Sequence, residues 1–110
     1  MTQVEEKPEI KPFPVKEVSA CLLAELTSLA ESELALQGVK PPAAPGALLT
    51  TKIRLDSLTV VDVTLALEDI LGFEPKNIVK TGGYDSIQAA LDHMMPRLEA
   101  AWKKTYSAGA

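Results

Sequence analysis

The chain has 110 residues, with 15 Asp or Glu against 11 Lys or Arg and a formal net charge of −4. That size fits one compact domain, and the acidic balance argues against a nucleic-acid binder, which needs clustered Lys and Arg. A single Cys and a single His exclude a disulfide framework and a multi-histidine metal site, so we expect no metal. No apolar run approaches the roughly 20 residues of a membrane span, and the charged start lacks the apolar region of a signal peptide. We therefore expect a cytoplasmic protein without a membrane span.

The first predicted helix runs from Val15 to about Leu36, where apolar residues recur with helical spacing. Gly38 follows, a residue that can end a helix because it adopts positive φ. The apolar stripe comprises Val18, Leu22, Leu26 and Leu29, widened by Leu23, Ala30 and Leu34. The next stretch, VKPPAAPGALLTTKIR, contains three prolines and a glycine. Regular helix is therefore not expected before about Leu49.

A second helix is predicted to begin at Asp56 and Ser57, whose side-chain oxygens can cap the free amides of a first turn, and to end at Gly72. Its β-branched residues would also suit a strand, but its length and its capping residues favour a helix. The apolar positions are Leu58, Val61, Leu65, Ile70 and Leu71, with Val60, Ala66 and Leu67 beside them.

The last helical segment follows residues 75–83, which end in two glycines and leave room for at most one helical turn. Asp85 and Gln88 have the spacing of a capping box at the start of this segment. Its apolar positions are Ile87, Leu91, Met94, Met95, Leu98, Ala101 and Trp102. Pro96 interrupts the pattern, so either one kinked helix or two helices would fit. The sequence thus predicts an all-α fold with three main helices and one short helix.

Composition divides the chain into three parts. Residues 1–16 contain three prolines among alternating charges, which is typical of a flexible N-terminal arm. Residues 17–95 hold most of the helical pattern, and residues 96–110 form a C-terminal helical extension or tail. We therefore expect one helical domain, over residues 17–95, that carries an arm and a tail.

The stretch LDSLTVVDVTLALEDILGFEP, followed by DSIQAALDHM, resembles the acyl carrier protein family. The residues that carry the resemblance are Asp56-Ser57-Leu58 at the start of the second helix, Ala66-Leu67-Glu68 towards its end, and Ile87-Gln88-Ala89-Ala90 in the last helix. The resemblance covers roughly residues 17–95 and is strongest over 55–95. It implies that residues 17–95 form a carrier domain with the fold of a small four-helix bundle. It also implies that the protein is not itself an enzyme.

In such proteins the serine of the motif bears 4′-phosphopantetheine, taken from coenzyme A as a phosphodiester, and the thiol of this arm holds the cargo as a thioester. The resemblance implies attachment at Ser57, with Asp56 contacting the arm and the modifying enzyme. A phosphodiester would also suit the start of a helix, where free amides and the macrodipole favour negative charge. The alternative is that Asp56 and Ser57 only cap the helix.

The resemblance also implies that the second helix is the recognition surface for partner enzymes. Residues 56–74 contain five acids and no base. The predicted recognition residues are Leu58, Val61, Asp62, Glu68 and Asp69. For the two apolar residues core packing is the alternative, and for the acids a solvated helix face. The implied partners of the monomeric carrier are a phosphopantetheinyl transferase and acyl- or aminoacyl-loading ligases, synthases or transferases with basic docking patches, as in fatty-acid or polyketide biosynthesis.

The chain departs from fatty-acid carriers at three positions: Thr59 stands where an acid is usual, Ile70 where another acid is frequent, and Arg54 where a glycine is usual. These differences indicate a specialised carrier whose cargo need not be a growing fatty acid. The resemblance also suggests a cavity for an apolar cargo. The expected lining is Val61, Leu65, Ile78 and Leu91.

Two other functions stay open at this point. One is an unmodified helical adaptor or scaffold that docks a basic partner through its acidic helix. The other is a serine hydrolase, which would need His93 as its base, and no G-x-S-x-G motif is present. We expect His93 to be structural and Cys21 to be inert packing. Trp102 is expected to pack within the tail or against the N-terminal arm.

Overall fold

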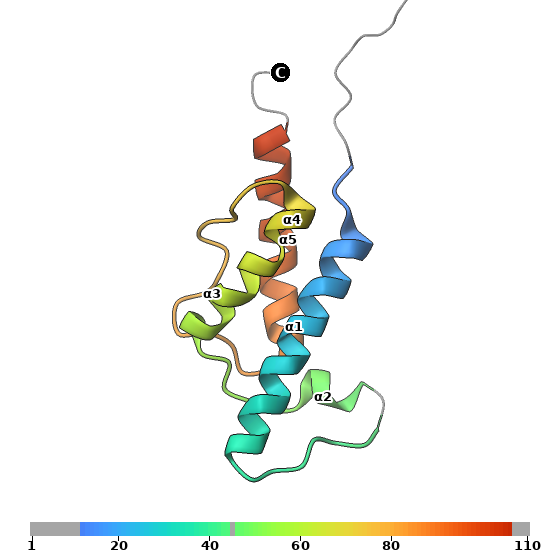
Figure 1. Cartoon of the computed structure of the whole chain (residues 1–110), viewed down its shortest axis with the longest axis vertical. Coiled ribbons are helices and arrows are strands. Elements are labelled where there is room, and N and C mark those ends of the chain that lie inside the picture. The colour runs from blue at the N-terminus through green and yellow to red at the C-terminus, as the bar shows by residue number, and fades with distance from the viewer. Residues whose placement is uncertain (1–11, 45, 107–110) are drawn as a thin grey trace, which may run out of the picture.

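The computed structural model describes residues 12–44 and 46–106, and this part of the chain is mostly helical (Figure 1). Five helices follow one another: α1 (Val15–Leu36), α2 (Ala47–Thr50), α3 (Ser57–Ala66), α4 (Glu68–Leu71) and α5 (Ile87–Tyr106). Within the described ranges there is no strand, and the only β-type pairing is an isolated bridge between Leu55 and Tyr84. The predicted all-α class is confirmed, whereas the flexibility expected of residues 1–11 lies outside the described residues.

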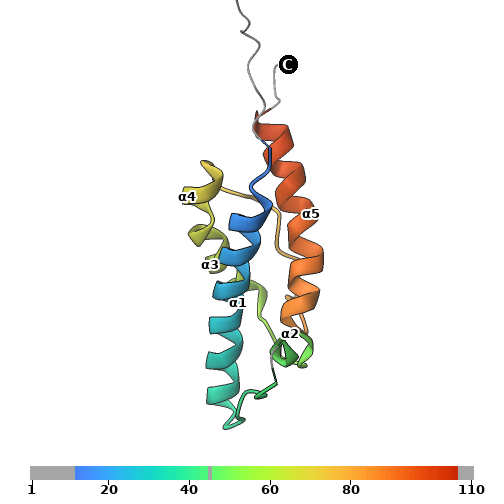
Figure 2. The same ribbon diagram turned by 90° about the vertical axis from the view of Figure 1, so that its right-hand side faces the viewer.

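The three longer helices run side by side around one core. α1 packs against both α3 and α5, and α2 packs mainly against α5. α1 runs in the opposite direction to α3 and α5, so that the start of α1 and the end of α5 lie at the same end of the molecule (Figures 1 and 2). The longest loop between these helices runs from the end of α4 to the start of α5.

Helix α1 has the predicted bounds and most of the predicted core face, but Leu23 is exposed and Leu29 is only half-buried. The residues buried on it recur every three or four positions, as a single helix face requires. They are Val18, Leu22, Leu26, Ala30 and Leu34. Gly38 follows with φ at +73°, as expected of a residue that ends a helix in the left-handed conformation. The local pattern decided this element because only one of its faces is apolar enough to be buried.

The two short helices, α2 and α4, lie at positions where the sequence pattern did not predict a short helix. The expectation of no helix before Leu49 is wrong by two residues, since α2 begins at Ala47, directly after Gly46 with φ at +78°. The turn expected within residues 75–83 does not form a helix, because Asn77 and both glycines that end this stretch adopt positive φ. The second short helix is instead α4, which continues from α3 through Leu67 and ends at Gly72.

The start of α5 is capped by a different residue from the predicted one. Ser86 Oγ accepts a hydrogen bond of 3.0 Å from the Ala89 amide, which satisfies a free donor of the first turn. The capping box of Asp85 and Gln88 is therefore wrong, and Gln88 Nε2 instead donates to Asp92 Oδ1 at 2.8 Å. The register differs by one residue because the backbone carbonyl of Asp85 is used elsewhere, as acceptor for the Ile53 amide.

Replacing Ser86 by alanine is expected to destabilise the protein by about 1 kcal/mol, the usual effect of losing an N-cap side chain. Asp85→Ala is the matched control and should cost less, because the backbone carbonyl of residue 85 is unaffected by the substitution. Chemical denaturation of both variants, followed by circular dichroism, measures the difference. A larger loss for Asp85→Ala than for Ser86→Ala would return the cap to residue 85.

Pro96 lies inside one continuous helix, α5, which runs on to Tyr106 and crosses the predicted boundary between residues 95 and 96 without interruption. Beyond Pro96, both Leu98 and Trp102 are buried in the core. The ring of Trp102 packs edge-on against Phe13, with centroids 6.0 Å apart, so the tail contacts the N-terminal arm as expected. The C-terminal half of α5 is therefore part of the same packed unit as α1.

Candidate functional site

The start of α3 is anchored to the start of α5 by a short antiparallel pairing. Leu55 and Tyr84 exchange two backbone hydrogen bonds, of 2.8 and 2.9 Å, and the Ile53 amide donates to the Asp85 carbonyl at 2.7 Å. The side chains of Leu55 and Tyr84 are both buried. The chain therefore enters α3 at a fixed position, which holds residues 56 and 57 in place.

Gly83 lies directly against this entry point. It is buried, it has φ at +81°, and a Cβ atom built on it would lie 1.9 Å from the Leu55 carbonyl oxygen and 2.9 Å from the Ser57 amide nitrogen. No side chain fits at this position, so the loop backbone can approach the first amide of α3 only because residue 83 is glycine. The sequence pattern indicated only a turn here. The pair of adjacent glycines is the sequence feature that could have indicated this role, and the second glycine of the pair contacts the entry to α3.

Asp56 and Ser57 occupy the first positions of α3, but neither acts as the predicted cap. Asp56 stands at the N-cap position with an extended backbone, and its exposed carboxylate makes no capping hydrogen bond. The first turn is closed by the backbone alone, where the Val60 amide donates to the Asp56 carbonyl at 2.9 Å. Ser57 is half-buried, and its hydroxyl has no hydrogen-bond partner among the residues that the structure describes. The structure thus leaves this hydroxyl unengaged at the start of a helix.

Helix α3 buries the opposite face from the one that its Leu58–Val61–Leu65 spacing indicates. The buried residues are Val60, Val63 and Thr64, and Leu67 directly after the helix. Leu58, Val61 and Leu65 are instead 76%, 45% and 55% exposed. Core packing is therefore excluded as the role of Leu58. These three residues share one side of the helix, and we call them the exposed apolar face of α3.

Acidic side chains accompany the exposed apolar face. Asp62 is exposed within α3, and Glu68 and Asp69 lie in the first turn of α4, half-buried and exposed respectively. None of these three carboxylates forms an ion pair within the described residues. The sequence has no Lys or Arg between Arg54 and Lys76. The acidic side chains beside the apolar face are therefore not neutralised by ion pairs within the described part of the chain.

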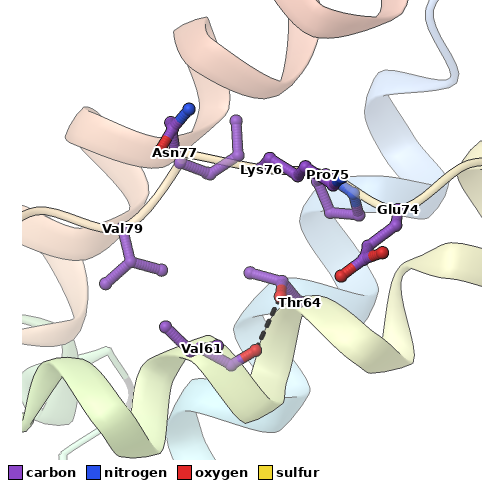
Figure 3. Close-up of a pocket in the computed structure, with 8 residues that line it drawn as sticks. Val61, Thr64, Glu74, Pro75, Lys76, Asn77 and Val79 are labelled. Carbon is purple, nitrogen blue, oxygen red and sulfur yellow. Dashed lines mark hydrogen bonds between the residues drawn. The ribbon is translucent and has the colours of Figure 1, made fainter.

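A groove of about 430 Å³ lies between α3 and the loop that leads to α5 (Figure 3). Its lining is Val61, Thr64, Glu74, Pro75, Lys76, Asn77, Ile78 and Val79. Val61 and Val79 lie on opposite sides of it, and the Thr64 hydroxyl is turned back to donate to the Val61 carbonyl at 2.6 Å. Val61 and Ile78 were expected to line a cavity between the second and the last main helix, and both line this groove. Leu65 and Leu91 do not, and the outer wall is the loop and not the last helix.

A second groove, of about 400 Å³, lies between α1 and the entry to α3. It is lined by Leu29, Glu33, Arg54, Leu55, Asp56 and Thr59. Three of these six residues are charged, so this groove is more polar than the first. The start of α3 is therefore flanked by two hollows of different chemical character.

His93 makes no hydrogen bond to Ser57 in the part of the chain that the structure describes. Its Nδ1 lies 2.7 Å from the Tyr84 hydroxyl, and its ring stacks at a tilt on Tyr84, with centroids 5.4 Å apart. Burial, together with the positive charges of Arg97 and Lys80, lowers the pKa of His93. Burial also raises the pKa of Tyr84. The ring of His93 is thus bound to Tyr84, which supports the structural role expected of His93.

The remaining reactive groups are also engaged in structure. Cys21 is half-buried, and burial and the nearby charge of Glu25 raise the pKa of its thiol, which makes the thiolate scarce. Among the described residues no group of three or more His, Cys, Asp or Glu side chains could hold a metal ion. In the same part of the chain, no helix combines the length and the apolar character that a membrane crossing requires.

No protein-family model, curated protein or solved structure matches this chain. At the start of α3, the Ser57 hydroxyl has no hydrogen-bond partner among the described residues. It lies at the N-terminus of a ten-residue helix that also carries the exposed apolar face.

Proposed function

We propose that this chain is a carrier protein of the acyl carrier type, in which Ser57 bears 4′-phosphopantetheine and presents acyl or aminoacyl thioesters to partner enzymes. The observation that carries the proposal is the Ser57 hydroxyl, which stands at the first residue of α3 with no hydrogen-bond partner in the described part of the chain. A serine that served only as a helix cap would have its oxygen bound to an amide of the first turn. Ser57 does not, which favours modification over capping.

The residues around Ser57 fit a phosphodiester. The first amides of a helix point towards its N-terminal end, and together with the macrodipole they favour an anion there. Gly83 leaves no side chain over the Ser57 amide, and Asp56 is exposed beside it, within reach of a modifying enzyme. When attached, the arm supplies the thiol to which the cargo is bound. The chain itself then needs no nucleophile or base, in keeping with its one His and one Cys.

Under this proposal the three longer helices correspond to the three main helices of a carrier bundle. Helices α1, α3 and α5 are its three main helices, and the turn of α4 prolongs the second of them. Residues 72–86, irregular here, connect the second main helix to the last. The departures at Thr59, Ile70 and Arg54 keep the cargo class open between acyl and aminoacyl groups.

The exposed apolar face of α3 is the proposed docking surface. Interfaces are strongest where a few apolar side chains fill pockets of the partner, while charges around them set the encounter rate and the choice of partner. Leu58 immediately follows Ser57, and Asp62 lies one turn further along the same helix. A partner with an apolar pocket and a basic rim would therefore bring its active site to the arm. The phosphopantetheinyl transferase and the cargo-loading enzymes are the proposed partners.

The groove between α3 and the loop before α5 is the proposed shelter for an apolar cargo. Val61, Ile78 and Val79 give it apolar walls, and Val61 also belongs to the docking surface. A cargo in the groove would therefore be covered on the side where partners bind. Release of the cargo to a partner and docking of that partner would therefore both involve the side chain of Val61.

The test is the intact mass of the protein after incubation with coenzyme A and a broad-range phosphopantetheinyl transferase. We expect the mass to increase by one phosphopantetheine group in the wild type and in Ser86→Ala, and not in Ser57→Ala. No increase in the wild type, or an increase that persists in Ser57→Ala, contradicts the carrier proposal. An adaptor that needs no modification would instead keep its binding to a basic partner when Ser57 is replaced.

Truncation of the docking surface should slow loading without unfolding the protein. For Leu58→Ala and Leu65→Ala we expect kcat/KM of the transferase to fall about tenfold, the usual effect of removing one important interface side chain. Leu36→Ala is the matched control, because Leu36 is 83% exposed and belongs to α1 and not to α3. Loading rates of these variants that equal the rate of Leu36→Ala would remove the exposed apolar face from the docking surface.

A further inference from the structure

Tyr84 is a buried residue that connects its own loop to the entry of α3 and to α5. Its backbone pairs with Leu55 at the entry to α3, and its hydroxyl accepts a hydrogen bond of 2.9 Å from the Lys80 amide. The same hydroxyl lies 2.7 Å from Nδ1 of His93 on α5. The backbone of Tyr84 therefore holds residues 72–86, the α4–α5 loop, to the entry of α3, and its side chain holds the same loop to α5. This loop also supplies the outer wall of the groove beside Val61.

The hydrogen bonds of Tyr84 limit where the protons can lie. The Lys80 amide can only donate, so it uses a lone pair of the Tyr84 oxygen. The single hydrogen of that hydroxyl is then available for Nδ1 of His93. Nδ1 can accept it only when it carries no proton itself, which requires neutral His93 with its proton on Nε2. A contact in which Tyr84 donates to His93 is thus one of neutral His93.

Protonation of His93 would disturb this arrangement. Nδ1 would become a donor towards the Tyr84 oxygen, and the hydroxyl hydrogen has no other acceptor among the described residues. The charged groups that act on the ring are both cations, Lys80 from the loop and Arg97 from α5, whose guanidinium donates to the His93 carbonyl. Helix α2, which also packs on α5, has no titratable side chain. A positive imidazole would therefore be poorly compensated at this position.

We propose that Lys80, Tyr84 and His93 form a proton-sensitive latch, in which neutral His93 holds the α4–α5 loop against α5 and protonation of its ring loosens this loop. The latch goes beyond the carrier function and does not depend on modification of Ser57. Because burial and the two cations lower the pKa of His93 in the folded protein, the unfolded chain binds the proton more readily. The stabilisation is therefore complete above the unfolded pKa, about 6.5, and is lost as the pH falls through the folded pKa.

Hydrogen exchange followed by NMR across the titration of His93 tests the latch on the unmodified full-length chain. His93 is the only histidine, so its ring resonances report its titration and tautomer directly. Between about pH 7.5 and about pH 5 we expect the protection of the Lys80 and Tyr84 amides, corrected for intrinsic exchange, to fall about tenfold. The change should have the same midpoint as the ring. The Leu26 amide, in the middle of α1, is the internal control and should keep its protection.

Two variants separate the latch from a general effect of pH. His93→Asn replaces the ring by a side chain that can accept a hydrogen bond but does not titrate, so the protection of both loop amides should become independent of pH. Tyr84→Phe removes the hydroxyl, so the Lys80 amide should exchange faster at every pH. The proposal is overturned if wild-type loop protection does not follow the ring titration, if His93→Asn retains the pH dependence, or if neutral His93 carries its proton on Nδ1. These readouts are independent of loading at Ser57, so failure of the latch and failure of the carrier function are distinguishable.

Discussion

Replacing Trp102 by alanine is expected to lower the free energy of unfolding by about 3–5 kcal/mol, the range for large aromatic side chains removed from a core. Trp102 is buried near the end of α5, with its ring 6.0 Å from that of Phe13 and 4.4 Å from that of Tyr106. Phe73 in turn packs on Tyr106, and the Tyr106 hydroxyl donates to the Leu71 carbonyl. Removal of the indole would therefore open the end of the molecule where α1, α4 and α5 meet.

Urea denaturation followed by far-UV circular dichroism measures this effect, with Leu58→Ala as the control. Leu58 is also a large apolar residue, but it is exposed, so its loss should change the stability by less than about 0.5 kcal/mol. A chain that ends at residue 95 should be less stable still, because it lacks both Leu98 and Trp102 from the core. If Trp102→Ala were no more destabilising than Leu58→Ala, the C-terminal half of α5 would be an appendage rather than part of the core.

Gly83→Ala is expected to destabilise the protein by more than about 2 kcal/mol and to displace the entry to α3. Two effects combine at this position. A left-handed conformation alone costs a residue other than glycine about 1–2 kcal/mol, and the new methyl group would overlap the Leu55 carbonyl oxygen. That oxygen belongs to the backbone and is bound to the Tyr84 amide, so it cannot move without breaking the pairing that anchors α3.

Gly82→Ala provides the matched control for this prediction. Gly82 also has positive φ, at +90°, but a Cβ atom there would meet nothing within 4 Å. Its replacement should therefore show the conformational effect alone, about 1 kcal/mol. Thermal unfolding of both variants gives the difference, and amide chemical shifts of residues 55–58 report whether the start of α3 moves. Equal losses for the two variants would mean that the loop accommodates the methyl group.

The site could be predicted from the sequence in part. The motif Asp56-Ser57-Leu58 located the start of α3 because helix starts are marked by local chemistry. The same reasoning wrongly assigned capping to the side chains of Asp56 and Ser57, since the first turn is closed by the backbone alone. It also missed the contact of Gly83 with the Ser57 amide. That contact joins residues 26 positions apart, and no local pattern specifies which of two adjacent glycines is pressed against another segment.

The sequence by itself determined the all-α class, the bounds of α1 and its buried face, because α1 has a single apolar side and burying that side is the dominant gain in folding. Helix α3 differs because it has apolar residues on both sides. Val60 and Val63 compete with Leu58 and Leu65 for the core, and periodicity cannot choose between two apolar faces. Only the tertiary structure decided which face packs on α1, since that choice depends on how α3 is anchored through the pairing of Leu55 with Tyr84. The face left outside is the one beside Ser57.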